Sequence, residues 1–114
     1  MLLLVKLTNS VKFLTYYIRG NRMPSAAARH ILVDSEEECI KLKSDIEAGT
    51  DFAESAKKFS KCPSGAGGGS LGEFHPGQMV PEFDKVVFNE EIGKVHGPIK
   101  TQFGYHLIEI TSRT

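Results

Sequence analysis

The chain has 114 residues, 40% of them hydrophobic and 25% charged, so it is long enough for one domain with a small core. Fourteen lysines and arginines balance fourteen aspartates and glutamates, which excludes the strongly basic composition of many nucleic-acid-binding domains. The apolar N-terminal segment is too short and too interrupted by lysines to span a bilayer comfortably. We therefore expect no nucleic-acid partner, no stable membrane association, and a monomer.

The N-terminal segment differs from the rest of the chain in charge. No acidic residue precedes Asp34. We expect residues 1–23 to form a basic, acid-free extension and residues 24–114 to form the folded domain. The composition of the extension is typical of an organelle presequence, and an extension without function is the open alternative. Two cysteines at a spacing that matches no zinc pattern favour a reducing compartment, which is the cytoplasm, or an organelle matrix if the extension is a presequence.

The first predicted elements of the domain are a strand and two helices. Residues 28–33, ARHILV, are apolar and rich in β-branched side chains, which predicts a strand. A capping box from Ser35 to Glu38 then begins a helix that Gly49 ends. Its buried face is predicted to carry Cys39, Leu42 and Ile46. The second helix is capped by Thr50 or Asp51 and is predicted to bury Phe52, Ala56 and Phe59.

The second half of the chain predicts three more strands and one helix. Residues 71–74 form a short strand, and residues 75–78 form a turn. Pro81 opens a helix that is predicted to bury Phe83, Val86 and Val87. Residues 95–100 and 105–111 form two strands joined by a tight loop. Because strands and helices do not alternate regularly, the pattern predicts an α+β domain around a small antiparallel sheet.

A glycine run precedes the second strand. Gly67, Gly69 and Gly72 satisfy the G-x-G-x-x-G pattern, but that pattern binds a dinucleotide only between a strand and a helix. Here a helix precedes the run and a strand follows it, so a nucleotide site is not expected. The run instead predicts a place where the backbone bends sharply or passes close to another group.

His30 and His106 lie in predicted strands, and Cys62 lies beside the glycine run. Alternation places His106 on the same face as Ile108 and Ile110. Three interpretations stay open at this point: hydrogen-bonded core histidines, a Cys-His hydrolase, and a metal site. The metal site needs a third ligand from a carboxylate, His75 or His96, and both of these histidines are expected in turns.

Large apolar side chains follow the glycine run and recur in the last hairpin: Leu71, Met79, Phe83 and Phe103. Ordinary core residues are one interpretation. Met79 is expected in a turn between Gly77 and Pro81, however, and loops with large apolar residues often line a concave site.

Four segments together, RHILV, FSKCPSG, GGSLGEFHPGQMVPEFDKVVF and GPIKTQFGYHLIEI, resemble the parvulin family of peptidyl-prolyl cis/trans isomerases. The small stand-alone bacterial members are the most similar, and the resemblance covers residues 28–113. It implies a four-stranded antiparallel sheet surrounded by three or four helices. It also implies isomerisation of X-Pro bonds in unfolded or partly folded polypeptides, with no cofactor and no metal. A non-catalytic chaperone or peptide-binding domain that uses the same groove is the alternative.

The resemblance also assigns residues to the active site. The catalytic group that it implies consists of Cys62, His30, His106 and Thr101. The pocket for the proline ring that it implies consists of Leu71, Met79 and Phe83, with Phe103 at the rim. Family members that require a phosphorylated residue before proline carry a long basic loop after the first strand. Residues 34–39 read DSEEEC instead, which repels phosphate, so we expect no phosphate-directed specificity.

Overall fold

The computed structural model describes residues 24–114, so the expectations for residues 1–23 lie outside the described residues. The elements follow in the order β1 Ala26–Val33, α2 Glu36–Glu47, α3 Phe52–Phe59, the 3-10 helix η2 Pro63–Gly67, β2 Ser70–Phe74, α4 Pro81–Val87, β3 Val95–Thr101 and β4 Gly104–Arg113. The predicted α+β class is confirmed. In this part of the chain no helix combines the length and apolar character needed to cross a membrane.

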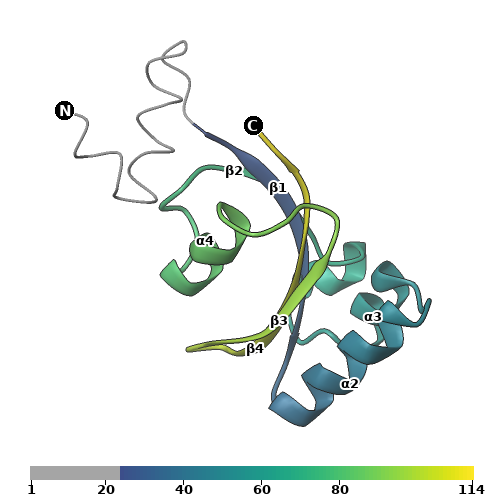
Figure 1. Cartoon of the computed structure of the whole chain (residues 1–114). Helices are drawn as coiled ribbons and strands as arrows, with labels where there is room; N and C mark the ends of the chain where they lie inside the picture. The colour runs from purple at the N-terminus through teal and green to yellow at the C-terminus, as the bar shows by residue number, and fades with distance from the viewer. Residues whose placement is uncertain (1–23) are drawn as a thin grey trace, which may run out of the picture.

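The four strands form one antiparallel sheet, as the family resemblance implies, and their order in it is β2-β1-β4-β3. The first and last strands of the domain are therefore neighbours at its centre (Figure 1). Their register pairs His30 with Ile108 and Leu32 with His106. The two histidines consequently lie on a diagonal across adjacent strands, which is within reach of long side chains.

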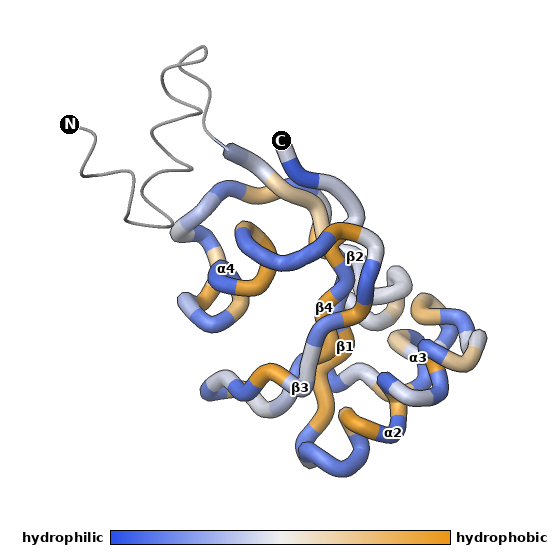
Figure 2. The backbone as a smooth tube through the Cα atoms, in the orientation of Figure 1, coloured by the Kyte–Doolittle hydropathy of each residue, from blue (hydrophilic) through white to orange (hydrophobic). Residues whose placement is uncertain are grey.

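The helices cover the two faces of the sheet separately. Figure 1 shows α2 and α3 on one face and α4 on the other. Under α2 and α3 lie the odd-numbered strand residues Ile31, Val33 and Leu107. Under α4 lie even-numbered residues, among them Ala28 and Ile108. In Figure 2 the hydrophobic stretches of β1 and β4 run between these helical layers. Because side chains alternate along a strand, the even-numbered His30 and His106 belong to the α4 face.

Side-chain caps begin both helices of the first layer. Ser35 Oγ accepts a hydrogen bond from the Glu38 N–H at 3.1 Å. The Asp51 carboxylate accepts one from the Glu54 N–H at 2.9 Å, so Asp51 rather than Thr50 caps α3. Such caps satisfy backbone donors that have no partner within the helix. They fix where α2 and α3 start, and hence where the chain between them turns.

The expected burial of Phe59 is wrong, because its side chain is 44% exposed. The buried stripe of α3 consists of Phe52, Ser55 and Ala56. At Ser60 the backbone becomes extended and leaves the helix, and Ser60 Oγ accepts a hydrogen bond from the Leu32 N–H of β1. The last turn of α3 therefore has no sheet beneath it, and helical spacing alone does not carry that information.

The glycine run is not a simple loop, because its first part folds into η2. The backbone passes close to another group at Gly69, and that group is the backbone of β1: φ is +87° and the Gly69 carbonyl oxygen accepts the His30 N–H at 2.9 Å. A Cβ at Gly69 would lie 2.3 Å from the His30 carbonyl oxygen. Only glycine lets this segment lie directly against β1.

Candidate active site

His30 and His106 are in direct contact on the α4 face of the sheet. Their Nδ1 atoms are 3.0 Å apart, and their rings are stacked with centroids 5.2 Å apart. Both side chains are buried, with 5% and 4% exposure. The diagonal register of β1 and β4 therefore brings together two residues 76 positions apart in sequence.

Thr101 closes one end of the histidine pair. Its hydroxyl lies 2.8 Å from His106 Nε2 and accepts the backbone N–H of Phe103 at 3.1 Å. Thr101 is the last residue of β3, and it faces Gly104 across the turn into β4. The turn thus holds the hydroxyl against the histidine, while the Phe103 side chain is 61% exposed.

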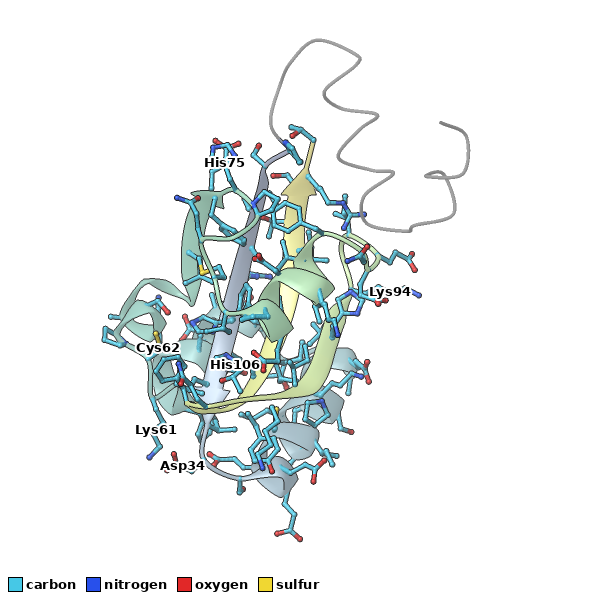
Figure 3. All side chains as sticks on the ribbon, turned by 90° about the vertical axis from the view of Figure 1, so that its left-hand side faces the viewer. Asp34, Lys61, Cys62, His75, Lys94 and His106 are labelled. Carbon is cyan, nitrogen blue, oxygen red and sulfur yellow. The ribbon has the colours of Figure 1, made fainter. Side chains whose placement is uncertain are left out.

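Cys62 lies at the other end of the pair, and Ser64 connects it to His30. Ser64 Oγ donates to Cys62 Sγ at 3.2 Å and lies 3.2 Å from His30 Nε2. In Figure 3 the labels of Cys62 and His106 mark the same end of the domain, and His75 lies near the other end. The Lys61 N–H donates to the Leu32 carbonyl oxygen at 2.7 Å, which holds this segment against β1.

These contacts form one directed series of hydrogen bonds when protons are assigned from donor capacity. Ser64 donates its only hydroxyl proton to Cys62 Sγ, so Ser64 Oγ must accept a hydrogen bond from His30 Nε2–H. A neutral imidazole carries one N–H, which leaves His30 Nδ1 as the acceptor for the His106 Nδ1–H. His106 Nε2 then accepts from the Thr101 hydroxyl. With both histidines neutral, all four ring nitrogens and both hydroxyl protons of the series have a partner.

The electrostatics of the site agree with a neutral pair. Burial, reinforced by the charge of His106, lowers the pKa of His30 from 6.5 to about 4. Burial also lowers the pKa of His106, and the Glu82 carboxylate partly offsets that effect. Near pH 7 both rings are uncharged and act as directional hydrogen-bonding groups rather than as cations.

The second cysteine is remote from this chemistry. Cys39 is fully buried in the core under α2, and both thiols are free. Burial, with a smaller contribution from Glu38, raises the pKa of the Cys39 thiol to about 11. Cys39 therefore stays protonated and unreactive, whereas Cys62 is half-buried at the edge of the site.

Phe83 packs against the histidine pair from α4. Its ring meets His30 and His106 edge-to-face at centroid distances of 5.7 and 6.0 Å. Leu71 and Met79 are partly buried against the same apolar cluster. The three residues that the family resemblance assigns to proline binding thus share one cluster, directly beside the hydrogen-bonded series.

The structure brings seven of the eight anticipated site residues into one cluster, and the eighth, Phe103, joins it through its backbone. His75 is exposed, and its Nδ1 atom is 2.9 Å from the Pro24 carbonyl oxygen. His96 belongs to β3 and not to a turn, and its Nε2 lies 2.8 Å from the Glu91 carbonyl oxygen. Residues 24–114 bring no three metal-ligating side chains together.

Sequence reasoning missed Ser64 and the contribution of Glu82. The signal for Ser64 was the C-P-S spacing, since a tight turn at Pro63 can present both flanking side chains to the same strand. Glu82 has no such signal, because it is exposed and acts on His106 only through its charge.

An antiparallel sheet, two neutral histidines from its central strands, and a thiol beside an apolar cluster define a peptidyl-prolyl isomerase domain of the parvulin type. Over residues 23–112 the chain matches the Rotamase family, described as the PPIC-type PPIase domain. The chain belongs to this family of isomerases. It is 42% identical over 94 residues to the foldase protein PrsA of Geobacillus sp. (strain WCH70). That match covers 82% of this chain and 34% of the relative.

Solved structures extend the same relationship. The crystal structure of the peptidylprolyl isomerase PrsA from Bacillus anthracis has a TM-score of 0.78 and 36% identity, covering 85% of this chain and 45% of that one. The parvulin NmPin of Nitrosopumilus maritimus has a TM-score of 0.72 and 33% identity, and the match covers 80% of this chain and 99% of NmPin. This chain thus spans about a third of the curated PrsA relative and nearly all of a small parvulin.

Proposed function

We propose that this chain isomerises X-Pro bonds in unfolded or partly folded polypeptides, without a requirement for phosphate. The observation that carries the proposal is the hydrogen-bonded series from Cys62 to Thr101, bordered by Leu71, Met79 and Phe83. Relatives described as foldases and chaperones support unfolded chains as the substrate class.

The chemistry is a rotation, and no bond has to break. Conjugation keeps the X-Pro amide planar, with a barrier of roughly 18–20 kcal/mol, so uncatalysed exchange takes tens to hundreds of seconds. Twisting the amide removes that conjugation and makes it less dipolar. A water-poor, apolar surface therefore favours the twisted state over the planar one. Lowering the barrier by about 5–7 kcal/mol accelerates exchange roughly 10⁴ to 10⁵-fold.

One group of residues holds the proline ring, and another surrounds the carbonyl group that rotates. The apolar cluster holds the proline ring, and the carbonyl side of the bond faces Cys62. Rotation needs no covalent intermediate, so Cys62 acts as a polar, polarisable neighbour of the turning carbonyl rather than as a nucleophile. The neutral histidine pair keeps this environment uncharged, and Phe103 borders the residue before proline.

Charge in the segment that follows β1 supports unphosphorylated substrates. The segment after β1 contains Asp34 and three consecutive glutamates, all in the first turns that follow the strand. Lys61, next to Cys62, is paired with Asp34 at 3.5 Å. The lysine next to Cys62 is therefore already paired with a carboxylate, and the acidic segment repels a phosphate on the residue before proline.

Exchange NMR on short peptides tests the proposal. The cis/trans exchange rate of Leu-Pro, Ser-Pro and phosphoserine-Pro peptides is measured with the full chain at a few per cent of the peptide concentration. We expect faster exchange for the first two and a much smaller effect for the third. Peptide shifts without faster exchange would instead identify a binding domain and overturn the proposal.

A matched pair of variants locates the activity. Met79→Asp introduces a charge into the apolar cluster and is expected to reduce the acceleration at least tenfold. Ile40→Asp introduces the same charge on an exposed position of α2, on the other face of the sheet. Equal losses in both variants would argue against the assigned site.

The compartment and the oligomeric state are also proposals. Two free thiols, one of them fully buried, support a reducing compartment such as the cytoplasm. Cell fractionation with mass spectrometry of the native N-terminus tests the compartment and the fate of residues 1–23. Light scattering tests the expected monomer.

A further inference from the structure

Ser64 lies where the thiol and the histidine pair meet. Among residues 24–114, the hydrogen bonds of Cys62 Sγ and of His30 Nε2 both run to Ser64 Oγ, each at 3.2 Å. Ser64 itself is half-buried. One oxygen atom thus joins two groups that otherwise have no common partner.

The backbone around Ser64 is held firmly. The Ser64 carbonyl oxygen accepts the Gly69 N–H at 2.9 Å, and the Cys62 carbonyl oxygen accepts the Gly65 N–H at 2.9 Å. A Cβ at Gly65 would lie 2.7 Å from the Ala56 carbonyl oxygen, so η2 packs closely on α3. The backbone that carries the Ser64 hydroxyl is therefore held in place by the fold.

The histidine pair has two neutral arrangements, and something must select between them. Either His106 Nδ1 or His30 Nδ1 carries the proton that the two rings share. In the first arrangement His30 Nε2 carries a proton and needs an acceptor. In the second, His30 Nε2 needs a donor. The hydroxyl of Ser64 selects the first arrangement when its own proton is directed at Cys62 Sγ.

We propose that Ser64 is a positioning residue that fixes the tautomers of His30 and His106 and the orientation of the Cys62 thiol. Removal of its hydroxyl releases both constraints together: His30 Nε2 loses its acceptor, and Cys62 Sγ loses its donor. The role of Ser64 in turnover rests on the proposed isomerase function. The assignment of the histidine tautomers does not depend on that function.

Two substitutions and one control separate this role from a general structural one. Ser64→Ala removes the hydroxyl, and Ser64→Thr restores it. Ser70→Ala makes the same chemical change at an exposed position of the same glycine-rich segment. Urea unfolding of each variant identifies any that does not fold, and Ser64→Thr keeps the test available if Ser64→Ala is unstable.

The first measurement is the tautomer state, read from the ring ¹⁵N shifts of both histidines near pH 7.5. We expect a proton on His30 Nε2 and on His106 Nδ1 in the unmodified chain, in Ser64→Thr and in the Ser70→Ala control. In Ser64→Ala we expect mixed or reversed tautomers. Unchanged tautomers in folded Ser64→Ala would overturn the proposal.

The second measurement is alkylation of Cys62 by iodoacetamide at fixed pH, with buried Cys39 as the internal unreactive thiol. The Ser64 hydroxyl holds the Cys62 sulfur in one orientation at the edge of the site, so Ser64→Ala should react about fivefold more slowly, a factor comparable to the loss of one ordinary hydrogen bond. Ser64→Thr should restore the rate. An equal or faster rate in Ser64→Ala contradicts the proposed donor.

Turnover distinguishes failure of the positioning role from failure of the function. If the chain is an isomerase, kcat for a Leu-Pro peptide should fall about tenfold in Ser64→Ala, with KM within a factor of two. A loss in KM alone would count against positioning of the reacting groups. If the unmodified chain accelerates no peptide, the proposed function fails, while the ¹⁵N shifts and the alkylation rates still decide the role of Ser64.

Discussion

Acid should destabilise this domain in a pH range set by His30. In the folded state its pKa is about 4, against 6.5 for an exposed histidine. The unfolded chain therefore binds a proton first as the pH falls, and the free energy of unfolding decreases wherever the unfolded state holds more protons. The stability contributed by neutral His30 is complete above pH 6.5 and is lost progressively down to pH 4.

The size of this effect follows from the difference between the two pKa values. Each pKa unit corresponds to about 1.36 kcal/mol, so protonation linked to His30 should lower the free energy of unfolding by about 1 kcal/mol at pH 5.5 and by about 2 to 3 kcal/mol at pH 4.5. His106 changes stability in the same direction, because burial lowers its pKa as well. For a domain of this size, each 1 kcal/mol corresponds to roughly 4–8 °C in Tm.

Urea unfolding at pH 7.5, 5.5 and 4.5 measures the effect, with His30→Gln as the comparison. The glutamine lowers stability at every pH because it disrupts the pair, but it removes one titrating group. We therefore expect a shallower pH dependence in the variant between pH 6.5 and 5, a range where ordinary carboxylates are still ionised. Identical slopes in the two proteins would refute the assignment of a depressed pKa to His30.

Three substitutions test the other structural assignments. Gly69→Ala should lower the free energy of unfolding in urea by more than about 2 kcal/mol, since its Cβ would overlap the His30 carbonyl oxygen. Gly72→Ala is the control, because Gly72 has φ of +71° but open space around it. Equal losses in the two variants would contradict the overlap. Phe83→Ala removes a ring that is 3% exposed and should cost about 3–5 kcal/mol, whereas a loss below 1 kcal/mol would contradict its burial. Cys62→Ser should keep measurable isomerase activity in the peptide exchange assay, and complete loss in a folded variant would favour a covalent role.

The sheet and the helices were accessible from sequence because their signals are local and periodic. The capping box at Ser35 and the apolar spacing that follows it define α2 without any tertiary information. Alternation places His106 on the same face as Ile108, and the structure has both on the α4 face of β4. The sequence thus assigns His106 to one side of the sheet, whereas the position of His30 on the same side follows from the register of β1 and β4.

The connection between the thiol and the histidines was not accessible in this way. It depends on where residues 60–69 lie against β1, and that is decided by backbone hydrogen bonds to Leu32 and His30. Such contacts leave no periodic pattern in the sequence. The same segment explains the error at Phe59, since the chain leaves α3 in order to pair with β1.

The glycine-rich segment consequently couples stability to the geometry of the site. Its hydrogen bond from His30 to Gly69 and its contact between Ser64 and His30 Nε2 act on the same strand residue, through the backbone and the side chain respectively. A change that moves this segment away from β1 therefore weakens the edge of the sheet and separates Cys62 from the histidine pair at once. Glycine is needed at position 69 because a side chain there would collide with β1, not because it would collide with a bound peptide.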